Sequence, residues 1–322
     1  MTTQLDFNIT QLDTGLMGPN FVACYLIEGK DEQGNSEYAI IETGNYQTTA
    51  HLIDYLKQQN ISKESIRYVI PTHVHLDHAG GASSLMEALP DASLVMHPKG
   101  ARHMIDPSKL IAGATAVYGE EFFKKIYGEI KPVPEHRVII AEDNTTLNIG
   151  NRELLFRDTP GHANHHFCIW DKTSQGWFTG DTFGVGYPSL NTDKGFFLFP
   201  TTSPVQFDPK RLISSIELLM KQKPKYMYLT HFGRISVNRS ISSGLVQQIN
   251  NYVDIIESLS EDQRTAEHLE TLLTEYTTTL LKKHGCELSP EEINKAIHLD
   301  IKLNSQGLLI WYERANKPRL IS

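Results

Sequence analysis

Two kinds of hydrophobic pattern divide the chain. From about residue 5 to residue 231, short apolar runs separated by polar stretches dominate, which is typical of β-strands joined by loops and helices. Beyond His231 the apolar positions recur at helical spacing instead, beginning with Ile241, Leu245 and Ile249. The pattern therefore predicts an α/β body that is followed by a helical extension.

The expected strands fall into two blocks, each accompanied by helices. The first block contains FNITQL, FVACYLIEG, EYAIIETG, RYVIPT and SLVMHP, and the second contains HRVII, TTLNIG, RELLFRDTP, HFCIWD, QGWFTGD and KYMYLT. Helical patterns cover about residues 47–60 and 79–89, and Asp208 before Pro209 is typical of a helix that starts there and runs to about Gln222. This order predicts two sheets with helices outside them.

Further helices are expected in an insertion and in the extension. The β pattern is interrupted at about residues 101–135, where YGEEFFKKIYGEI predicts one inserted helix that is rich in aromatic residues. Ser260 with Gln263 forms a capping box for a second helix of the extension, which stops at Gly285. Ser289 with Glu292 opens a third helix in the same way.

Composition and charge exclude several classes of protein. The 322 residues are 40% hydrophobic and 21% charged, as in ordinary globular proteins. The net charge is −8 and no basic stripe occurs, so nucleic acid is not an expected partner. Only three scattered cysteines occur, which favours a reducing compartment over a disulfide framework. No signal-peptide pattern and no long apolar span are visible, so we expect a cytoplasmic protein that does not bind membranes.

The segment THVHLDHAGG at residues 72–81 concentrates ionisable side chains where a strand ends. Alternate residues of an extended chain share a face, so His73 and His75 are expected to point the same way, with Asp77 and His78 following at a turn. The glycines at 80 and 81 allow close backbone approach before the next helix. Imidazoles and a carboxylate in this spacing are suitable donors for one or two divalent cations.

Three later strand ends carry the donors that such a centre lacks. His162 follows a strand in DTPGH, Asp181 ends WFTGD, and His231 lies in YLTHFG. One histidine after a strand is more often a capped or hydrogen-bonded residue. Together with the first motif, however, the three residues point to a single metal centre.

These four motifs resemble those of the metallo-β-lactamase superfamily, and more narrowly its glyoxalase II-like hydrolases, over about residues 15–235. The resemblance implies an α/β fold, a four-layered αββα sandwich with the metals at one edge. It also implies two divalent metal ions per chain, zinc first, with manganese or iron as the alternatives. The implied ligands are His73, His75 and His162 for one ion, Asp77, His78 and His231 for the other, and Asp181 between both.

The chain also departs from the family pattern. Glu42-Thr43-Gly44 stands where the family often has Asp-x-Gly, so the support beneath the metals is expected to differ. Cationic residues matching those that hold glutathione are not found. The third residue after Asp181 is Gly184 where quorum-sensing lactonases have a tyrosine, and the spacing leaves open whether Tyr187 replaces it.

The resemblance and the chemistry of the donors imply a hydrolase. Two divalent ions that share a water lower its pKa to about 7, and Asp77 is the candidate catalytic residue that orients this nucleophile. The expected substrate is a small ester, thioester or lactone with an apolar part. Three alternatives stay open: a phosphodiesterase, which the charge balance disfavours; a sulfur dioxygenase with one iron; and a regulatory protein that binds a ligand without turnover.

Several other residues allow two interpretations. His165 and His166 either support the metal ligands or form a partly exposed pair, and His97 is expected to be structural. Two aromatic groups either line an apolar pocket or simply pack: Phe122, Phe123 and Tyr127, and Phe196, Phe197 and Phe199. We expect a catalytic domain at 1–237 and an extension at 238–322 that packs near the active site. The apolar stripe of the extension, with Tyr252 and Ile256, either roofs the site or forms a homodimer interface.

Overall fold

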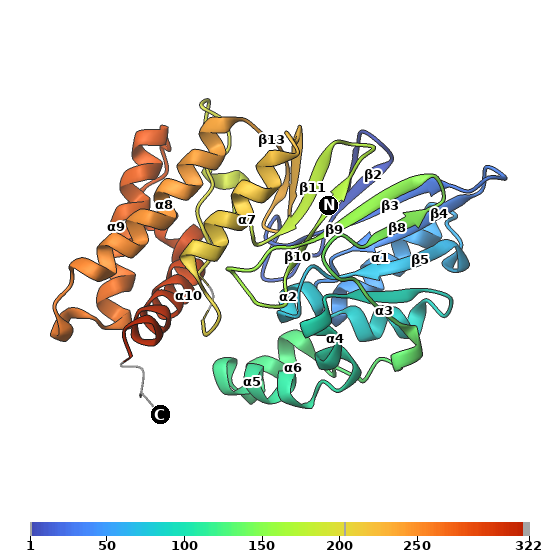
Figure 1. Ribbon diagram of the computed structural model, residues 1–322, viewed down its shortest axis with the longest axis horizontal. Helices are drawn as coiled ribbons and strands as arrows, with labels where there is room; N and C mark the ends of the chain where they lie inside the picture. Colours follow the sequence, from blue (N-terminus) through green and yellow to red (C-terminus); the bar gives the residue numbers. More distant parts are fainter. Residues whose placement is uncertain (1, 203, 318–322) are drawn as a thin grey trace. The chain divides into compact units, whose positions relative to one another are not determined.

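The computed structural model describes residues 2–202 and 204–317, which form two compact units (Figure 1). The first, here called the sheet unit, comprises the chain up to Asp158 together with His165–Gly180 and Pro224–Ser236. The second, the helical unit, comprises Thr159–Asn164, Asp181–Lys223 and the chain from Val237. The two units therefore alternate along the sequence. The division of the chain at residue 237 stays a prediction.

The first sheet of the sheet unit has seven strands in sequence order. They are β1 (Thr2–Leu5), β2 (Ile9–Asp13), β3 (Ala23–Lys30), β4 (Ser36–Ile41), β5 (Ile66–Ile70), β6 (Ser93–Met96) and β7 (Val138–Ile140). Pairs from β1 to β4 are antiparallel, and pairs from β4 to β7 are parallel. Parallel neighbours need crossover connections, which here contain α1 (Tyr46–Gln58), then α2 (Leu76–Ala79) with α3 (Ala82–Ala88).

The second sheet has six strands in the order β13-β12-β11-β10-β9-β8. They are β8 (Thr146–Ile149), β9 (Arg152–Asp158), β10 (Phe167–Asp171), β11 (Gly176–Gly180), β12 (Tyr226–Leu229) and β13 (Gly233–Ser236). Only β11 and β12 pair in parallel among these neighbours. The long connection between them is the part of the chain that enters the helical unit after Gly180 and leaves it before Pro224.

Buried apolar side chains hold the layers of the sheet unit together. One core joins the two sheets, with Tyr25 and Ile41 from the first sheet and Phe156, Phe178 and Tyr228 from the second. Another core lies between the first sheet and its helices, where residues such as Leu52, Leu85 and Met104 are buried. Strands β3 to β6 therefore present apolar side chains to both faces of the first sheet, which explains their nearly continuous apolar runs.

The insertion differs from the single helix that the sequence predicted. Between β6 and β7 the chain forms α4 (Pro98–Ile105), α5 (Ser108–Tyr118) and α6 (Glu120–Tyr127), followed by the 3-10 turn η2 (Glu135–Arg137). On α6, Phe123 and Tyr127 are buried against Leu76 and Ile130, whereas Phe122 is 36% exposed. The predicted aromatic helix is therefore α6. The sequence analysis missed α4, which starts at a proline, and α5, which has no side-chain cap.

The helical unit contains the 3-10 turn η3 (Pro188–Leu190) and the helices α7 (Pro209–Lys221), α8 (Arg239–Ser258), α9 (Ala266–His284) and α10 (Pro290–Asn316). The predicted starts at Asp208 and Ser289 are confirmed, because each side chain accepts a backbone N–H as an N-cap, and Gly285 ends α9 with φ +96°. The predicted start of α9 was wrong. The capping box of Ser260 and Gln263 exists, but it closes the 3-10 turn η4 (Glu261–Gln263), and Thr265 caps α9.

Two short edge strands were not predicted from the sequence. β1 reads TTQL and β13 reads GRIS, and neither has an apolar run. The strands that the sequence did predict are present, with boundaries shifted by a few residues. Among the residues that the structure describes, no helix combines the length and apolarity that crossing a bilayer requires.

Candidate metal centre

The motif at residues 72–81 lies where the chain leaves β5. The chain bends over residues 72–75, and this brings the two imidazoles together, with His73 Nε2 2.8 Å from His75 Nδ1. His75 then caps α2, whose single turn carries Asp77 and His78. The predicted common orientation of the two histidines is confirmed, and α2 forms the turn expected after them.

Glycine at position 81 permits a close contact below this turn. A Cβ atom on Gly81 would lie 2.5 Å from the carbonyl oxygen of Thr43 and 2.6 Å from that of Asn45. Gly81 also donates its N–H to the carbonyl of Gly44 at 2.9 Å. The motif's second glycine therefore lets the turn lie directly on the segment that follows β4.

Asp77, His78 and His231 form a compact group within the sheet unit. Each offers one ligand atom within 4.8 Å of the other two. Asp77 Oδ2 lies 3.6 Å from His78 Nε2 and 3.2 Å from His231 Nε2. Two histidines and a carboxylate at this spacing match the donor set of a divalent transition-metal site.

Glu42 connects three parts of the sheet unit beneath these side chains. Its Oε1 accepts hydrogen bonds from Thr72 Oγ1 at 2.6 Å and from Thr230 Oγ1 at 2.8 Å. The same oxygen lies 2.9 Å from His78 Nδ1, and Oε2 accepts the backbone N–H of Thr72 at 3.1 Å. Glu42 is fully buried and adopts φ +65°, an unfavourable conformation for a residue with a side chain. The Glu42 carboxylate thus joins the ends of β4, β5 and β12.

Three histidines of the sheet unit have an oxygen atom beside Nδ1. The Glu42 carboxylate lies beside Nδ1 of His78. The backbone carbonyl of Phe21 accepts the Nδ1–H of His231 at 2.9 Å. Thr72 Oγ1 donates to Glu42, so its oxygen accepts the Nδ1–H of His73 at 3.1 Å. An imidazole that donates Nδ1–H leaves Nε2 unprotonated, which is the form that binds a metal.

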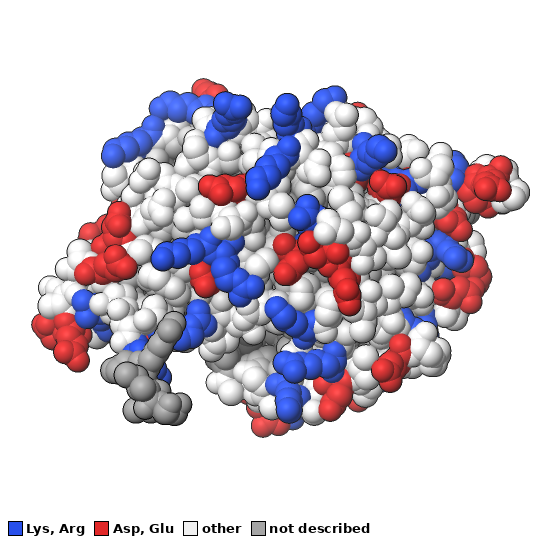
Figure 2. All heavy atoms as spheres, in the orientation of Figure 1, with Lys and Arg blue, Asp and Glu red and all other residues white. Residues whose placement is uncertain are grey.

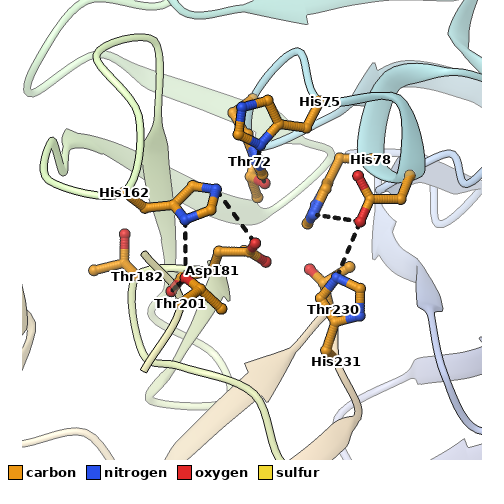
Figure 3. A network of polar contacts seen from close by, with 12 residues as sticks. Thr72, His75, His78, His162, Asp181, Thr182, Thr201, Thr230 and His231 are labelled. Carbon is orange, nitrogen blue, oxygen red and sulfur yellow. Dashed lines mark hydrogen bonds and ion pairs between the residues drawn. The ribbon is translucent and has the colours of Figure 1, made fainter. Parts of the chain in front are cut away.

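The other two predicted ligands lie in the helical unit. His162 follows β9 and Asp181 follows β11, and His162 Nε2 is 3.3 Å from Asp181 Oδ2 (Figure 3). Thr201 Oγ1 is 2.8 Å from His162 Nδ1 and 3.3 Å from the Asp181 carbonyl oxygen. His162 therefore shares with the other three an oxygen at Nδ1, and like His78 and His231 it has Nε2 next to a carboxylate.

The structure thus brings five of the predicted ligands together in the sheet unit and two in the helical unit. A family model described as the metallo-beta-lactamase superfamily matches residues 17–231, which include all seven. The chain belongs to the metallo-β-lactamase superfamily. The fold expected from the sequence, an αββα sandwich followed by helices, is thereby confirmed.

Individual relatives agree with this assignment. The metallo-beta-lactamase fold-containing protein ST1585 of Sulfurisphaera tokodaii is 28% identical over 54% of this chain and 63% of its own length. The solved structure of ST1585 has a TM-score of 0.62 at 20% identity, covering 94% of this chain and 98% of that one. The matched part is thus less than two thirds of that relative's sequence, and at this identity the structural likeness shows the fold alone.

Two further relatives carry the names of enzymes. An N-acyl homoserine lactonase of Bacillus thuringiensis is 24% identical over 63% of this chain and 78% of its own length. A hydroxyacylglutathione hydrolase of Pelagibacter ubique is 28% identical over 42% of this chain and 43% of its own length. Superfamily members are mostly hydrolases, so a hydrolase is the broad class that these similarities support.

His165 and His166 differ from the partly exposed pair that was one expectation for them. Both are buried, and the ring centroids of His166 and His73 lie 4.8 Å apart. Burial lowers the pKa of His165 to about 2, so this imidazole is neutral. His97 caps α4 with Nδ1, and its Nε2 lies 3.0 Å from Asp158 Oδ1, in agreement with the structural role predicted for it.

Two positions near Asp181 explain a departure from the superfamily's lactonases. A Cβ atom on Gly184, which has φ +75°, would lie 2.6 Å from the Phe199 carbonyl oxygen and 3.1 Å from Leu245 Cδ1. A tyrosine at position 184 therefore does not fit. The Tyr187 hydroxyl lies 3.0 Å and 3.2 Å from the two carboxylate oxygens of Asp300 on α10, so its proton is donated within the helical unit.

The sequence analysis missed the residues that orient the histidines. Glu42 was noted only as a departure, and Thr72, Thr201 and Thr230 were not considered. A signal for two of them was present, because Thr72 and Thr230 each directly precede a ligand histidine at a strand end. Thr201 has no such signal, since it lies 39 residues from His162.

Proposed function

We propose that this protein is a hydrolase with two divalent metal ions, acting on an ester, thioester or lactone with an apolar part. The observation that carries the proposal is the shared arrangement of His73, His78, His162 and His231. Each has an oxygen atom beside Nδ1, which supports metal binding through Nε2. Histidines in an ordinary core do not need this common orientation, whereas metal ligands do.

The residues present fit two metal ions. His73, His75 and His162 would hold one ion, and Asp77, His78 and His231 the other, with the Asp181 carboxylate between them. The superfamily match supports this ligand set, because its matched region, residues 17–231, contains all seven candidate ligands. Nitrogen and carboxylate donors suit zinc, manganese and iron, and zinc is the ion we propose first.

When bound, the metal ions would supply the activated water, because a divalent cation lowers the pKa of its bound water to about 7 and polarises a substrate carbonyl. The chain's own residues orient the reactants. Asp77 keeps 30% of its side chain exposed while Oδ2 faces His78 and His231, so its carboxylate is within reach of a water molecule. We assign Asp77 the role of accepting a hydrogen bond from this nucleophile and fixing its direction.

The substrate class follows from relatives and charge. A lactone and a hydroxyacylglutathione are both attacked at a carbonyl, and relatives of this chain carry the names of enzymes for each. Phosphodiesters are less suitable as substrates, because these anions bind best to a surface with clustered cationic side chains. On the face that Figure 2 displays, lysine and arginine are interspersed with acidic residues.

A panel of substrates tests this proposal. Protein loaded with zinc, manganese or iron is assayed with acyl thioesters, acyl lactones of increasing chain length and phosphodiesters, while oxygen uptake is recorded. We expect hydrolysis of a thioester or lactone that improves with acyl length and stops on metal removal. Oxygen uptake with a single iron identifies a dioxygenase instead, phosphodiester cleavage alone identifies a nuclease-like enzyme, and ligand binding without turnover identifies a regulatory protein.

A further inference from the structure

Two side chains of the C-terminal extension hold the segment that contains Thr201. Asn304 of α10 donates from Nδ2 to the Pro200 carbonyl at 2.9 Å and accepts the Thr202 N–H on Oδ1 at 2.6 Å. The Thr202 hydroxyl returns a hydrogen bond to the Asn304 carbonyl at 2.7 Å. Gln248 of α8 adds a hydrogen bond from Nε2 to the Leu198 carbonyl at 2.8 Å.

Thr201 lies between the two residues that Asn304 holds. Its hydroxyl has one proton, and donating this proton to the Asp181 carbonyl at 3.3 Å leaves the oxygen to accept Nδ1–H of His162 at 2.8 Å. The Nε2 atom of His162 then faces Asp181 Oδ2 at 3.3 Å. A continuous chain of contacts therefore runs from α10 through Thr201 to a candidate metal ligand.

A carboxamide suits these contacts. Its two polar atoms offer a donor to Pro200 and an acceptor to Thr202 from one short side chain. Asn304 is 2% exposed, so water does not replace these hydrogen bonds when the side chain is shortened. Without the amide, the Pro200 carbonyl and the Thr202 N–H lose their partner on Asn304. The segment around Thr201 must then shift to satisfy these two groups.

We propose that Asn304 is a positioning residue for the metal ligand His162, acting through Thr201. This inference rests on the proposed function, because it assumes that His162 binds a metal ion. It gives the extension a role that was not expected from the sequence. The extension fixes the geometry of the metal centre, although none of the seven predicted ligands lies beyond residue 231.

Metal affinity is the measurement that tests the proposal. Zinc is titrated into the metal-free full-length protein in competition with a chromophoric chelator, for the wild type, Asn304→Ala, Asn304→Asp and Thr201→Val. Replacing a residue that orients a metal ligand typically lowers affinity about 10–100-fold, so we expect a loss of at least about tenfold at one of two sites in Asn304→Ala. Asn304→Asp keeps the acceptor for Thr202 and loses the donor, so its loss is smaller.

A neighbouring residue supplies the control. Ser305 is also buried, but its hydroxyl donates to the Lys302 carbonyl of its own helix, so Ser305→Ala leaves both zinc affinities unchanged. If Asn304 acts through Thr201, the double variant Thr201→Val with Asn304→Ala loses no more affinity than the weaker-binding single variant. Additive losses in this cycle overturn the proposed route.

The outcomes separate this inference from the proposed function. Wild-type protein with two zinc ions, combined with folded Asn304 variants of unchanged affinity, overturns the inference alone. Wild-type protein that binds no metal overturns both. If Asn304→Ala does not fold, Asn304→Asp and Thr201→Val decide the question, because each removes a single hydrogen-bonding group, and unchanged zinc affinity in both rejects the role of Asn304.

Discussion

At the scale of single residues, Glu42 is the polar group on which most of the candidate centre depends. One buried carboxylate accepts hydrogen bonds from Thr72 and Thr230 and holds Nδ1 of His78. These partners belong to segments that are far apart in the sequence. The candidate ligands could be chosen from the sequence because their motifs follow apolar runs, but the pairing of position 42 with position 230 depends on the fold.

Glu42→Gln is expected to weaken metal binding about 10–100-fold. In the variant an NH₂ group replaces a carboxylate oxygen that accepts hydrogen bonds from Thr72 or Thr230 in the wild type. The variant also lacks the negative charge next to His78. Zinc titration of the metal-free protein measures the effect. Glu37→Gln is the matched control, since Glu37 lies on β4, the strand that Glu42 directly follows, but bonds to Gly150 and Arg67. Equal zinc affinity in the two variants contradicts the role given to Glu42.

Asp181→Asn tests the bridging position. The substitution preserves shape and removes the charge that a carboxylate places between two cations, so we expect most hydrolysis to be lost and both ions to bind more weakly. Elemental analysis after dialysis, together with turnover, gives the answer. Loss of one ion only, or nearly full turnover, means that Asp181 does not bridge.

At the scale of helices and strands, the sequence was informative wherever a cap or an apolar run marked an element. The ends at Asp208, Gly285 and Ser289 were correctly predicted because each is a local motif. The edge strands β1 and β13 escaped prediction since an exposed edge needs no apolar pattern. The stripe of α8 was expected to require a roof or a dimer. Leu245, Ile249, Tyr252 and Ile256 are buried within the described chain, while the roof and the dimer stay predictions.

Helix α6 provides a stability test with an internal control. Phe123 is 6% exposed and packs against Leu76, between His75 and Asp77 in the motif, whereas the adjacent Phe122 is 36% exposed. Phe123→Ala is expected to lower the free energy of unfolding by about 3 kcal/mol, as for a buried phenylalanine. Phe122→Ala changes it by no more than about 0.5 kcal/mol. Urea unfolding of the metal-free protein, followed by circular dichroism, distinguishes the two, and equal effects would contradict the packing described for α6.

At the scale of the whole molecule, the family and fold were predictable because four short motifs in a fixed order identify them. The alternation of the chain between two units was not predictable. It arises where the chain leaves β9 after Asp158 and β11 after Gly180, and no change in composition marks either point. The roof over the site, the homodimer and the cytoplasmic location stay predictions.

Metal removal is expected to destabilise the folded protein. An ion that binds only the folded state contributes about 4 kcal/mol when its concentration is 1,000 times its Kd. For a chain of this size the melting temperature should therefore fall by roughly 10 °C after treatment with a chelator. Differential scanning calorimetry with and without added zinc measures the shift. An unchanged melting temperature indicates that the histidine clusters hold no metal.

The central claim, a hydrolase with two metal ions, is tested most directly by a titration in which turnover is the signal. Zinc is added in steps to the metal-free protein at a concentration well above the Kd, while hydrolysis of the best acyl thioester or lactone is followed. The account predicts that activity rises to an end point at two equivalents of zinc per chain. An end point at one equivalent, or tight zinc binding without any hydrolysis, contradicts it.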